Sequence, residues 1–212
     1  MTEHLRIATD GAAAAREALD KCVRGGGVVL FGADTVYALG CDPSSDAAIE
    51  RIYALKGREP GKPSAVMFFS PLAMRELIST LGSRTRDALG VLLPGAVTAV
   101  VHNPEHRYPL ACREDPERLG VRLIEGPLAG AASAVFQTSA NPSGEPAPHR
   151  FEDIDPGVIA GADVAIDGGD LGGVPSTVVD LSAIEDGGEW GVLREGAVSR
   201  SELERRLATV GA

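Results

Sequence analysis

Short apolar runs alternate along this chain with amphipathic segments that have helical spacing. Residues 28–31 and 65–69 are apolar runs of strand length, and residues 48–55 between them carry an apolar stripe that Ser44, Ser45 or Asp46 can cap. Further strands are expected at residues 97–101, 119–124, 134–137, 163–166, 177–181 and 190–193, and further helices at residues 12–23, 71–80, 83–92, 127–132 and 201–210. This alternation predicts an α/β fold with an open, twisted, mixed sheet.

The ends of this pattern suggest where the first and last helices begin. Asp10 is placed to cap the first helix, and Ser199 or Ser201 to cap the last. The 212 residues contain no internal repeat and no interdomain linker, so a single domain over residues 1–212 is expected.

The formal net charge of -10 limits the partners of the protein. An acidic chain is unsuited to a broad nucleic-acid footprint or to an anionic membrane surface. A phosphate-bearing ligand must therefore bind in a local basic pocket.

Cysteine and histidine usage points away from metal and disulfide chemistry. Cys22, Cys41 and Cys112 form no CxxC or zinc pattern, so free buried thiols in a reducing cytosol are expected. His102 and His106 lie four residues apart, but the Asn-Pro dipeptide between them breaks a helix, and no metal site is predicted. The polar N-terminus has no apolar signal region, and no run is long enough to span a membrane. A cytoplasmic location is expected.

The densest cluster of cations is the segment 56–63, which contains Lys56, Arg58 and Lys62. Its glycines and prolines end the preceding helix and make a rigid turn before the next strand. Cations held between a helix and a core strand suggest an anion site, with a polyphosphate as the guest. The alternative is that Lys56 only complements the helix dipole while Arg58 and Lys62 are solvated.

Two polar loops and one strand arginine are further candidates for ligand contacts. Residues 34–40 follow an apolar strand and begin with Asp34 and Thr35, either as ligand contacts or as an ordinary turn with Asp34 as a local cap. Residues 138–144 could bind a phosphate or ribose, or form only a network of side-chain turns. Arg122 lies among apolar residues, where it either forms an internal ion pair or binds a carboxylate of a ligand.

The sequence contains no arrangement typical of nucleophilic or paired-carboxylate catalysis. The glycine-rich segment 168–176 matches neither the P-loop nor the dinucleotide-binding pattern. A chemistry that needs no protein nucleophile fits these residues better.

Taken together, seven motifs resemble the YrdC-like threonylcarbamoyl-AMP synthase family, in the order of that family and from the first strand to Gly196. The motifs are DTVYALG at 34–40, IYALKGR at 52–58 with Lys62-Pro63, LPG at 93–95 with Thr98, GVR at 120–122, TSANPSG at 138–144, PSTVVD at 175–180 and LREG at 193–196.

The resemblance implies a fold and a reaction. The family has an open twisted α/β sheet around a deep, positively charged cavity, and its reaction is a nucleotidyl transfer. It joins L-threonine, bicarbonate and ATP into threonylcarbamoyl-AMP and releases pyrophosphate. Mg2+ is expected as a cofactor that binds together with ATP. Other proteins then transfer the threonylcarbamoyl group to tRNA, and direct tRNA binding by this chain is doubtful given its charge.

The same resemblance implies the residues of the site. Lys56 and Arg58 match the family's K-x-R signature and are expected to be catalytic, in a solvated cavity, by balancing charge that develops on phosphate. ATP is expected to bind Arg58, Lys62, Asn141, His149 and Arg194, and threonine is expected to bind Thr35, Arg122, Ser139 and Ser176.

This sequence departs from the family pattern at several positions. Gly32-Ala33 replaces the usual Pro-Thr before Asp34, and Ala38 replaces a glycine. Arg122 is followed by Leu123-Ile124 where the family has a proline. The local shape of the threonine pocket is therefore expected to differ from that of the family. The additional C-terminal domain of longer relatives is not expected here.

Three other functions are compatible with these residues. The chain could be an RNA-binding module of the same fold, although its acidic charge counts against this. It could be related to carbamoyl-transfer enzymes that use carbamoyl phosphate. It could also be a paralogue that keeps the fold without the synthase activity.

Overall fold

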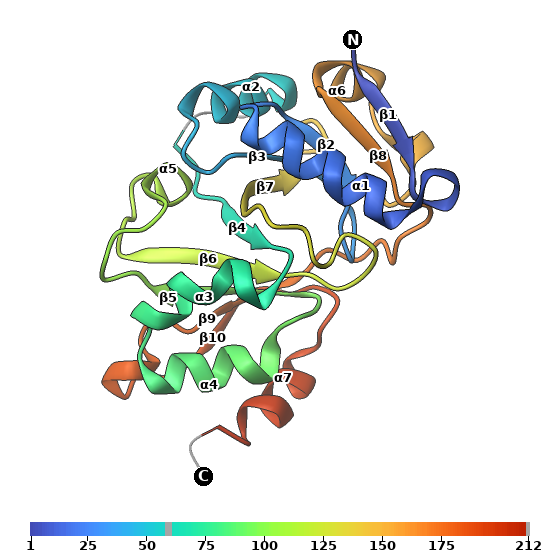
Figure 1. Cartoon of the computed structure of the whole chain (residues 1–212). Coiled ribbons are helices and arrows are strands. Elements are labelled where there is room, and N and C mark those ends of the chain that lie inside the picture. The colour runs from blue at the N-terminus through green and yellow to red at the C-terminus, as the bar shows by residue number, and fades with distance from the viewer. Residues whose placement is uncertain (58–60, 211–212) are drawn as a thin grey trace.

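A single ten-stranded sheet organises the protein (Figure 1). The computed structural model describes residues 1–57 and 61–210. The strands are β1 (Glu3–Arg6), β2 (Val29–Gly32), β3 (Tyr37–Cys41), β4 (Ala65–Phe68), β5 (Val97–His102), β6 (Arg118–Leu123), β7 (Val135–Ser139), β8 (Val164–Asp167), β9 (Thr177–Asp180) and β10 (Gly191–Arg194). The helices are α1 (Ile7–Arg24), α2 (Asp46–Lys56), α3 (Pro71–Thr80), α4 (Ser83–Leu92), α5 (Pro109–Cys112), α6 (Pro156–Gly161) and α7 (Arg200–Leu207), with single 3-10 turns at Phe151–Asp153 and Ile184–Asp186.

The sheet is mixed, as the sequence predicts. Its strand order is β1-β8-β2-β3-β7-β4-β6-β5-β9-β10. The pairs β1–β8, β8–β2, β4–β6 and β5–β9 are parallel, and the other five neighbouring pairs among the described strands are antiparallel. The predicted class, an open twisted α/β sheet, is therefore confirmed.

The two faces of the sheet are covered differently. Successive strand residues point to opposite faces, so Leu30 joins the larger apolar core while Val29 and Phe31 join the smaller one. Helices α2, α3, α4 and α7 contribute to the larger core. On the opposite face α1 contacts β1, β8, β2 and β3. Figure 1 shows α1 across the upper part of the sheet, away from β5, β6 and β9.

Several sequence-based boundaries are confirmed. The bounds of α3 and α4 agree with the predicted ranges, because Ser70 caps the first and Gly82 separates the two. Ser45 caps α2 through the backbone N–H of Ala48, and Ser199 caps α7.

Other expectations are wrong for identifiable reasons. The first helix begins at Ile7 and kinks at Gly11 (φ 83°), and the Asp10 carboxylate accepts from the backbone N–H of Arg6 instead of capping the later helix. Residues 37–41, expected in a loop, form the buried strand β3 between β2 and β7.

Residues 127–132 form turns and not the expected helix. Gly126 and Gly130 both have left-handed φ, and the N–H of Gly130 donates to the carbonyl of Phe69 (2.6 Å), the residue after β4, so the chain turns after each glycine. β1 and α6 were not predicted.

Candidate functional site

Polar side chains occupy one face of the sheet where a buried core would have apolar ones. Ser139 and Gln137 of β7, Arg122 of β6 and Thr98 of β5 lie on the face that α1 leaves uncovered. The neighbouring strand residue Val121 points the other way, into the larger core. Strand alternation thus keeps one side of these strands apolar and leaves the other for a ligand.

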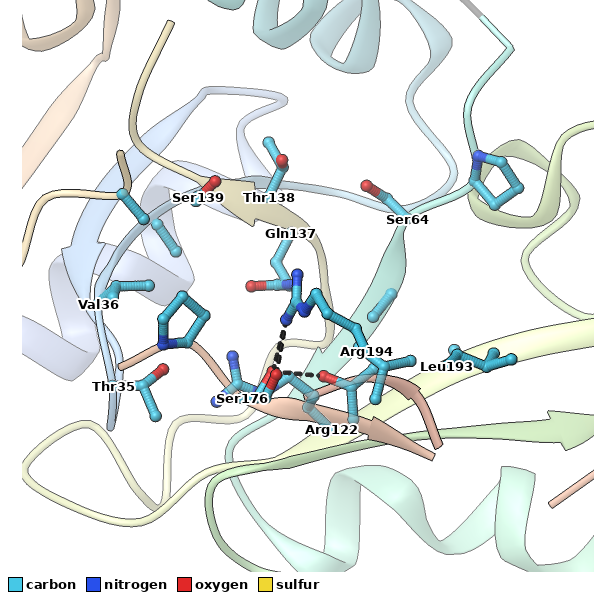
Figure 2. A pocket seen from close by; sticks show the side chains of 18 of the residues that line it. Thr35, Val36, Ser64, Arg122, Gln137, Thr138, Ser139, Ser176, Leu193 and Arg194 are labelled. Carbon is cyan, nitrogen blue, oxygen red and sulfur yellow. Dashed lines mark hydrogen bonds between the residues drawn. The ribbon is translucent and has the colours of Figure 1, made fainter. Parts of the chain in front are cut away.

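These side chains form the floor of a cavity of about 560 Å³, within the usual range for ligand pockets. Thr35 and Val36 line it from the turn before β3, and Ser176 lines it from the segment that enters β9. Figure 2 shows these residues facing Ser139 and Thr138 across the cavity, with Arg194 reaching in from β10. The N-terminal and C-terminal halves of the chain therefore both contribute to the walls.

Ser176 lies at the centre of a hydrogen-bond network on the cavity wall. Its hydroxyl is 2.8 Å from the hydroxyl of Thr98, and its backbone carbonyl accepts from Arg194 Nη2 (2.7 Å). A register shift between Val192 and Arg194 in β10 bulges the strand, which turns the Arg194 side chain toward the cavity. The expected ATP residue Arg194 is thus in direct contact with the expected threonine residue Ser176.

Arg122 forms a buried ion pair with Asp34. The residue is 3% exposed, and its Nη2 donates to Asp34 Oδ1. Burial raises the pKa of the Asp34 carboxyl and lowers the pKa of the Arg122 guanidinium, and in each case the partner's charge opposes the shift. The internal ion pair considered from the sequence is therefore present, and Asp34 is a partner of Arg122 and not a local cap.

Three polar atoms at this end of the cavity have no hydrogen-bond partner in the described part of the chain. They are Asp34 Oδ2, Thr35 Oγ1 and Arg122 Nε. Buried polar groups in proteins are almost always paired, so an unpaired cluster at a cavity wall favours a polar ligand that completes it. Acceptor and donor atoms both occur here, and an amino acid carries both kinds of group.

The charge of the cavity is mixed among the described residues. Arg118, Arg122 and Arg194 line it together with the carboxylates of Asp115 and Glu145. Arg118 is drawn toward Asp180 (2.6 Å), so part of its charge is neutralised. The positively charged cavity expected from the resemblance stays a prediction.

Lys56 does not lie in a solvated cavity, and that expectation is wrong. The residue is 4% exposed at the end of α2, and its Nζ donates to the backbone carbonyls of Ser139 and Asn141, the latter at 2.6 Å. Gly57 takes a left-handed C-cap conformation (φ 56°), which ends the helix where Lys56 meets the loop after β7. Lys56 therefore holds this loop, and its catalytic role stays a prediction.

The remaining predicted residues divide between the cavity and its surroundings. Ser139 and Asn141 line the cavity. Lys62 and His149 are exposed and are not among the lining residues, although Pro63 and Ser64, next to Lys62, are. Arg58 lies outside the described residues, so both its ATP contact and its catalytic role stay predictions.

The departure after Arg122 leaves the strand intact. Leu123 is buried in the larger core and Ile124 in the smaller one, and the N–H of Ile124 donates to the carbonyl of Phe68 (3.2 Å). Arg122 pairs in register with Met67 of β4. The missing proline therefore does not displace Arg122 from the cavity floor.

Sequence reasoning missed several residues of the site. Gln137 and Arg118 line the cavity, and Thr98, noted only as part of a motif, lies on its floor. Each is a polar residue at an alternate position of an apolar strand or at its start, which is the signal that could have identified them.

The described residues contain neither a metal-binding cluster nor a disulfide. No group of three or more His, Cys, Asp or Glu residues that could hold a metal ion is found among these residues. His102 and His106 both meet Glu117 on the surface, at 3.5 and 2.6 Å. The three cysteines are free, but Cys22 is only half-buried.

None of the described helices is both long and apolar enough to cross a membrane.

Comparisons with known proteins agree with this fold and these motifs. The family model of the Sua5, YciO and YrdC proteins, described as telomere recombination, matches residues 21–196. A threonylcarbamoyl-AMP synthase of Chromohalobacter salexigens is 32% identical over 77% of this chain and 90% of its own length. A protein of the same name from Nitrosococcus oceani is 35% identical over 59% of this chain and 70% of its own length.

Solved structures share the fold at lower identity. P. abyssi Sua5 complexed with L-threonine has a TM-score of 0.79 at 24% identity, and the match covers 99% of this chain and 62% of that protein. E. coli YciO has a TM-score of 0.76 at 23% identity, with 96% and 98% covered. The resemblance read from the sequence motifs is confirmed. The chain belongs to the Sua5/YciO/YrdC family.

Proposed function

We propose that this protein makes L-threonylcarbamoyl-AMP and pyrophosphate from L-threonine, bicarbonate and ATP, a nucleotidyl transfer. The observation that carries the proposal is the cavity wall in which Thr35, Arg122, Ser139 and Ser176 meet Asn141 and Arg194. Curated relatives with the name threonylcarbamoyl-AMP synthase support it. The product would supply the threonylcarbamoyl group that other proteins transfer to tRNA.

The proposed reaction needs alignment and charge balance more than a protein nucleophile. The threonine amine condenses with bicarbonate: the C–N bond forms, a C–O bond of bicarbonate breaks, and the departing hydroxide leaves as water with the amine proton. A carbamate oxygen then attacks the α-phosphorus of ATP. The new O–P bond forms as the bond from that phosphorus to the pyrophosphate oxygen breaks. Holding the reactants in line on a rigid sheet face contributes to the rate, since oriented reactants avoid much of the entropic cost.

The residues have complementary roles in this scheme. Arg122 pairs with the threonine carboxylate through Nε, which has no partner among the described residues, and the hydroxyls of Thr35, Ser139 and Ser176 bind the remaining polar groups of the amino acid. Arg194 and Asn141 face the nucleotide, and the Arg194 cation opposes the charge on its phosphates.

Mg2+ would enter with ATP. This ion takes oxygen ligands and is usually held by one or two carboxylates together with substrate phosphates. Asp115 and Glu145 are the carboxylates of the described cavity lining, and either could supply such an oxygen. The ion, when bound, would reduce the charge on the leaving pyrophosphate.

The direct test is to incubate the protein with ATP, Mg2+, bicarbonate and L-threonine and to measure pyrophosphate and the adenylate. We expect pyrophosphate release that requires both threonine and bicarbonate. Release without threonine, or no release, would remove the synthase proposal and leave a paralogue without synthase activity. A parallel titration with tRNA at two salt concentrations tests the RNA-binding alternative, since phosphate contacts weaken as salt rises.

The choice of amino acid tests the pocket more finely. Valine would leave buried polar groups unpaired, so we expect its kcat/KM to be lower than that of threonine by roughly 10⁴-fold. Serine loses only a methyl group, and its penalty should be about 10–200-fold. Valine used as well as serine would mean that the pocket recognises shape and not the hydroxyl.

A further inference from the structure

We infer that Thr98 is a positioning residue for amino-acid binding, which acts by holding the hydroxyl of Ser176 toward the substrate. The inference rests on the proposed function and deepens it. Thr98 touches the cavity floor but acts through Ser176, so its loss should weaken threonine binding without affecting ATP binding to the same extent.

The first support is the geometry of the two hydroxyls. Thr98 and Ser176 are 7% and 3% exposed, and their side-chain oxygens lie 2.8 Å apart. A serine hydroxyl rotates freely unless a partner fixes it, and burial excludes most water partners here. Thr98 is the nearer of the two described partners of the Ser176 hydroxyl, since Arg194 Nη2 lies 3.4 Å away, so Thr98 has the larger part in determining which direction remains open to a ligand.

The second support is the position of Thr98 in the sheet. Strand β5 alternates, so Val97 and Ala99 enter the larger core while Thr98 points to the cavity and pairs in register with Val178 of β9. The core of the sheet does not need a hydroxyl at this position, because β-branched valine has the same strand preference. Its described side-chain hydrogen bond goes to Ser176 alone among the bonds of the described residues.

The third support is that the backbone of Ser176 is already fixed by other contacts. Arg194 Nη2 donates to the Ser176 carbonyl (2.7 Å), and the N–H of Thr177 donates to the carbonyl of Ala96 (3.0 Å). Removing the Thr98 hydroxyl should therefore leave the Ser176 hydroxyl with only the long contact from Arg194 Nη2 (3.4 Å) among the described bonds, while the chain path and Arg194 stay in place. This separates an effect on threonine from an effect on ATP.

The test is the pair Thr98→Val and Thr98→Ser, with Thr85→Val as a matched control. Thr85 is a buried threonine of α4 that does not line the cavity. We expect Thr98→Val to raise the KM for threonine about tenfold, the effect of losing one ordinary hydrogen bond, with the KM for ATP within about twofold. Thr98→Ser, which keeps the hydroxyl, and Thr85→Val should both stay within about twofold of the parent protein.

A double variant and a direct titration complete the design. In a Ser176→Ala background, Thr98→Val should change the threonine KM by less than about twofold, because the group it positions is gone. Titration of L-threonine alone into the protein and Thr98→Val should show the same tenfold difference in affinity. That readout distinguishes failure of the inference from failure of the synthase proposal, since it requires no turnover.

Several results would overturn the inference. They are an unchanged threonine affinity in Thr98→Val, an equal rise in the KM for ATP, fully multiplicative effects of the two substitutions, and no threonine binding by the parent protein. If Thr98→Val does not fold, Thr98→Ala takes its place. Loss of the fold in both variants would mean that the hydroxyl serves stability, and would also overturn it.

Discussion

Two cations buried in this protein, Lys56 and Arg122, have different surroundings. Lys56 ends α2 and donates to the backbone carbonyls of Ser139, at the end of β7, and of Asn141 in the loop that follows. Arg122 lies near the end of β6, pairs with the Asp34 carboxylate, and keeps its Nε without a partner in the described chain. Lys56 is not among the lining residues of the cavity, whereas Arg122 is part of its floor.

The comparison separates a cation that builds a site from one that meets the ligand. The backbone carbonyls that accept hydrogen bonds from Lys56 belong to Ser139 and Asn141, which are predicted to hold threonine and ATP respectively. A defect at Lys56 should therefore reach both substrates. Arg122 touches only the end of the cavity where the partnerless polar atoms gather, so a defect there should reach the amino acid alone.

The largest expected effect follows replacement of Arg122. Arg122→Gln removes the cation that we assign to the threonine carboxylate, and loss of one partner of a buried charge pair costs about 2–5 kcal/mol. We expect kcat/KM for threonine to fall by roughly 10²–10³-fold with little change in the KM for ATP. Arg86→Gln, an exposed arginine of α4, is the control. Equal losses for both substrates would contradict the assignment.

Asp34→Asn should have an effect of similar size, on stability. It leaves the Arg122 charge buried without its carboxylate, at a cost of about 3–5 kcal/mol in the free energy of unfolding. Because burial raises the Asp34 pKa and disfavours both charges, the double variant Asp34→Asn/Arg122→Met should recover most of that loss.

Urea unfolding gives the free energy of unfolding of the two variants, with Asp87→Asn at an exposed position of α4 as the control. The direction of the pH dependence follows from the raised pKa of the Asp34 carboxyl. A carboxyl whose pKa is raised by folding adds stability when it is protonated, and that contribution disappears as the pH rises through the raised pKa. A double variant less stable than Asp34→Asn would show that the pair itself stabilises the fold.

The smallest of these effects is expected for Lys56→Met, which keeps the apolar stem and removes the ammonium group. It removes the Lys56 donor from the part-buried carbonyls of Ser139 and Asn141, so the free energy of unfolding should fall by about 1–3 kcal/mol. The KM values for threonine and ATP should rise by similar factors. Lys21→Met on the exposed face of α1 is the control. A large loss of kcat with unchanged stability would instead support direct catalysis by Lys56.

The sequence predicts local elements better than it predicts the pairs that build the site. Helices α3 and α4 follow from periodicity and caps that lie within a few residues of each other. Strand β3 was missed because its pairing with β2 and β7, and not its composition, makes it a strand. The expected helix at 127–132 fails because Gly126 before it and Gly130 within it turn the chain.

The site shows the same division. Four residues that the family motifs identify as ligand contacts line the cavity: Thr35, Ser139, Asn141 and Ser176. The partners of the two buried cations could not be predicted from the sequence, because Asp34 and Arg122 are 88 residues apart and Lys56 and Ser139 are 83 residues apart. Local patterns carry no information on such pairs, which is why Lys56 was placed in solvent.

One measurement tests the division between the two cations most directly. L-threonine and ATP are titrated separately into the parent protein, Arg122→Gln and Lys56→Met, and the two affinities are compared within each protein. We expect Arg122→Gln to lose threonine binding by at least about 10²-fold, in line with a lost buried charge pair, and to keep ATP binding. Lys56→Met should weaken both. Threonine binding to Arg122→Gln at the parent affinity would contradict the assignment of Arg122 to the substrate carboxylate.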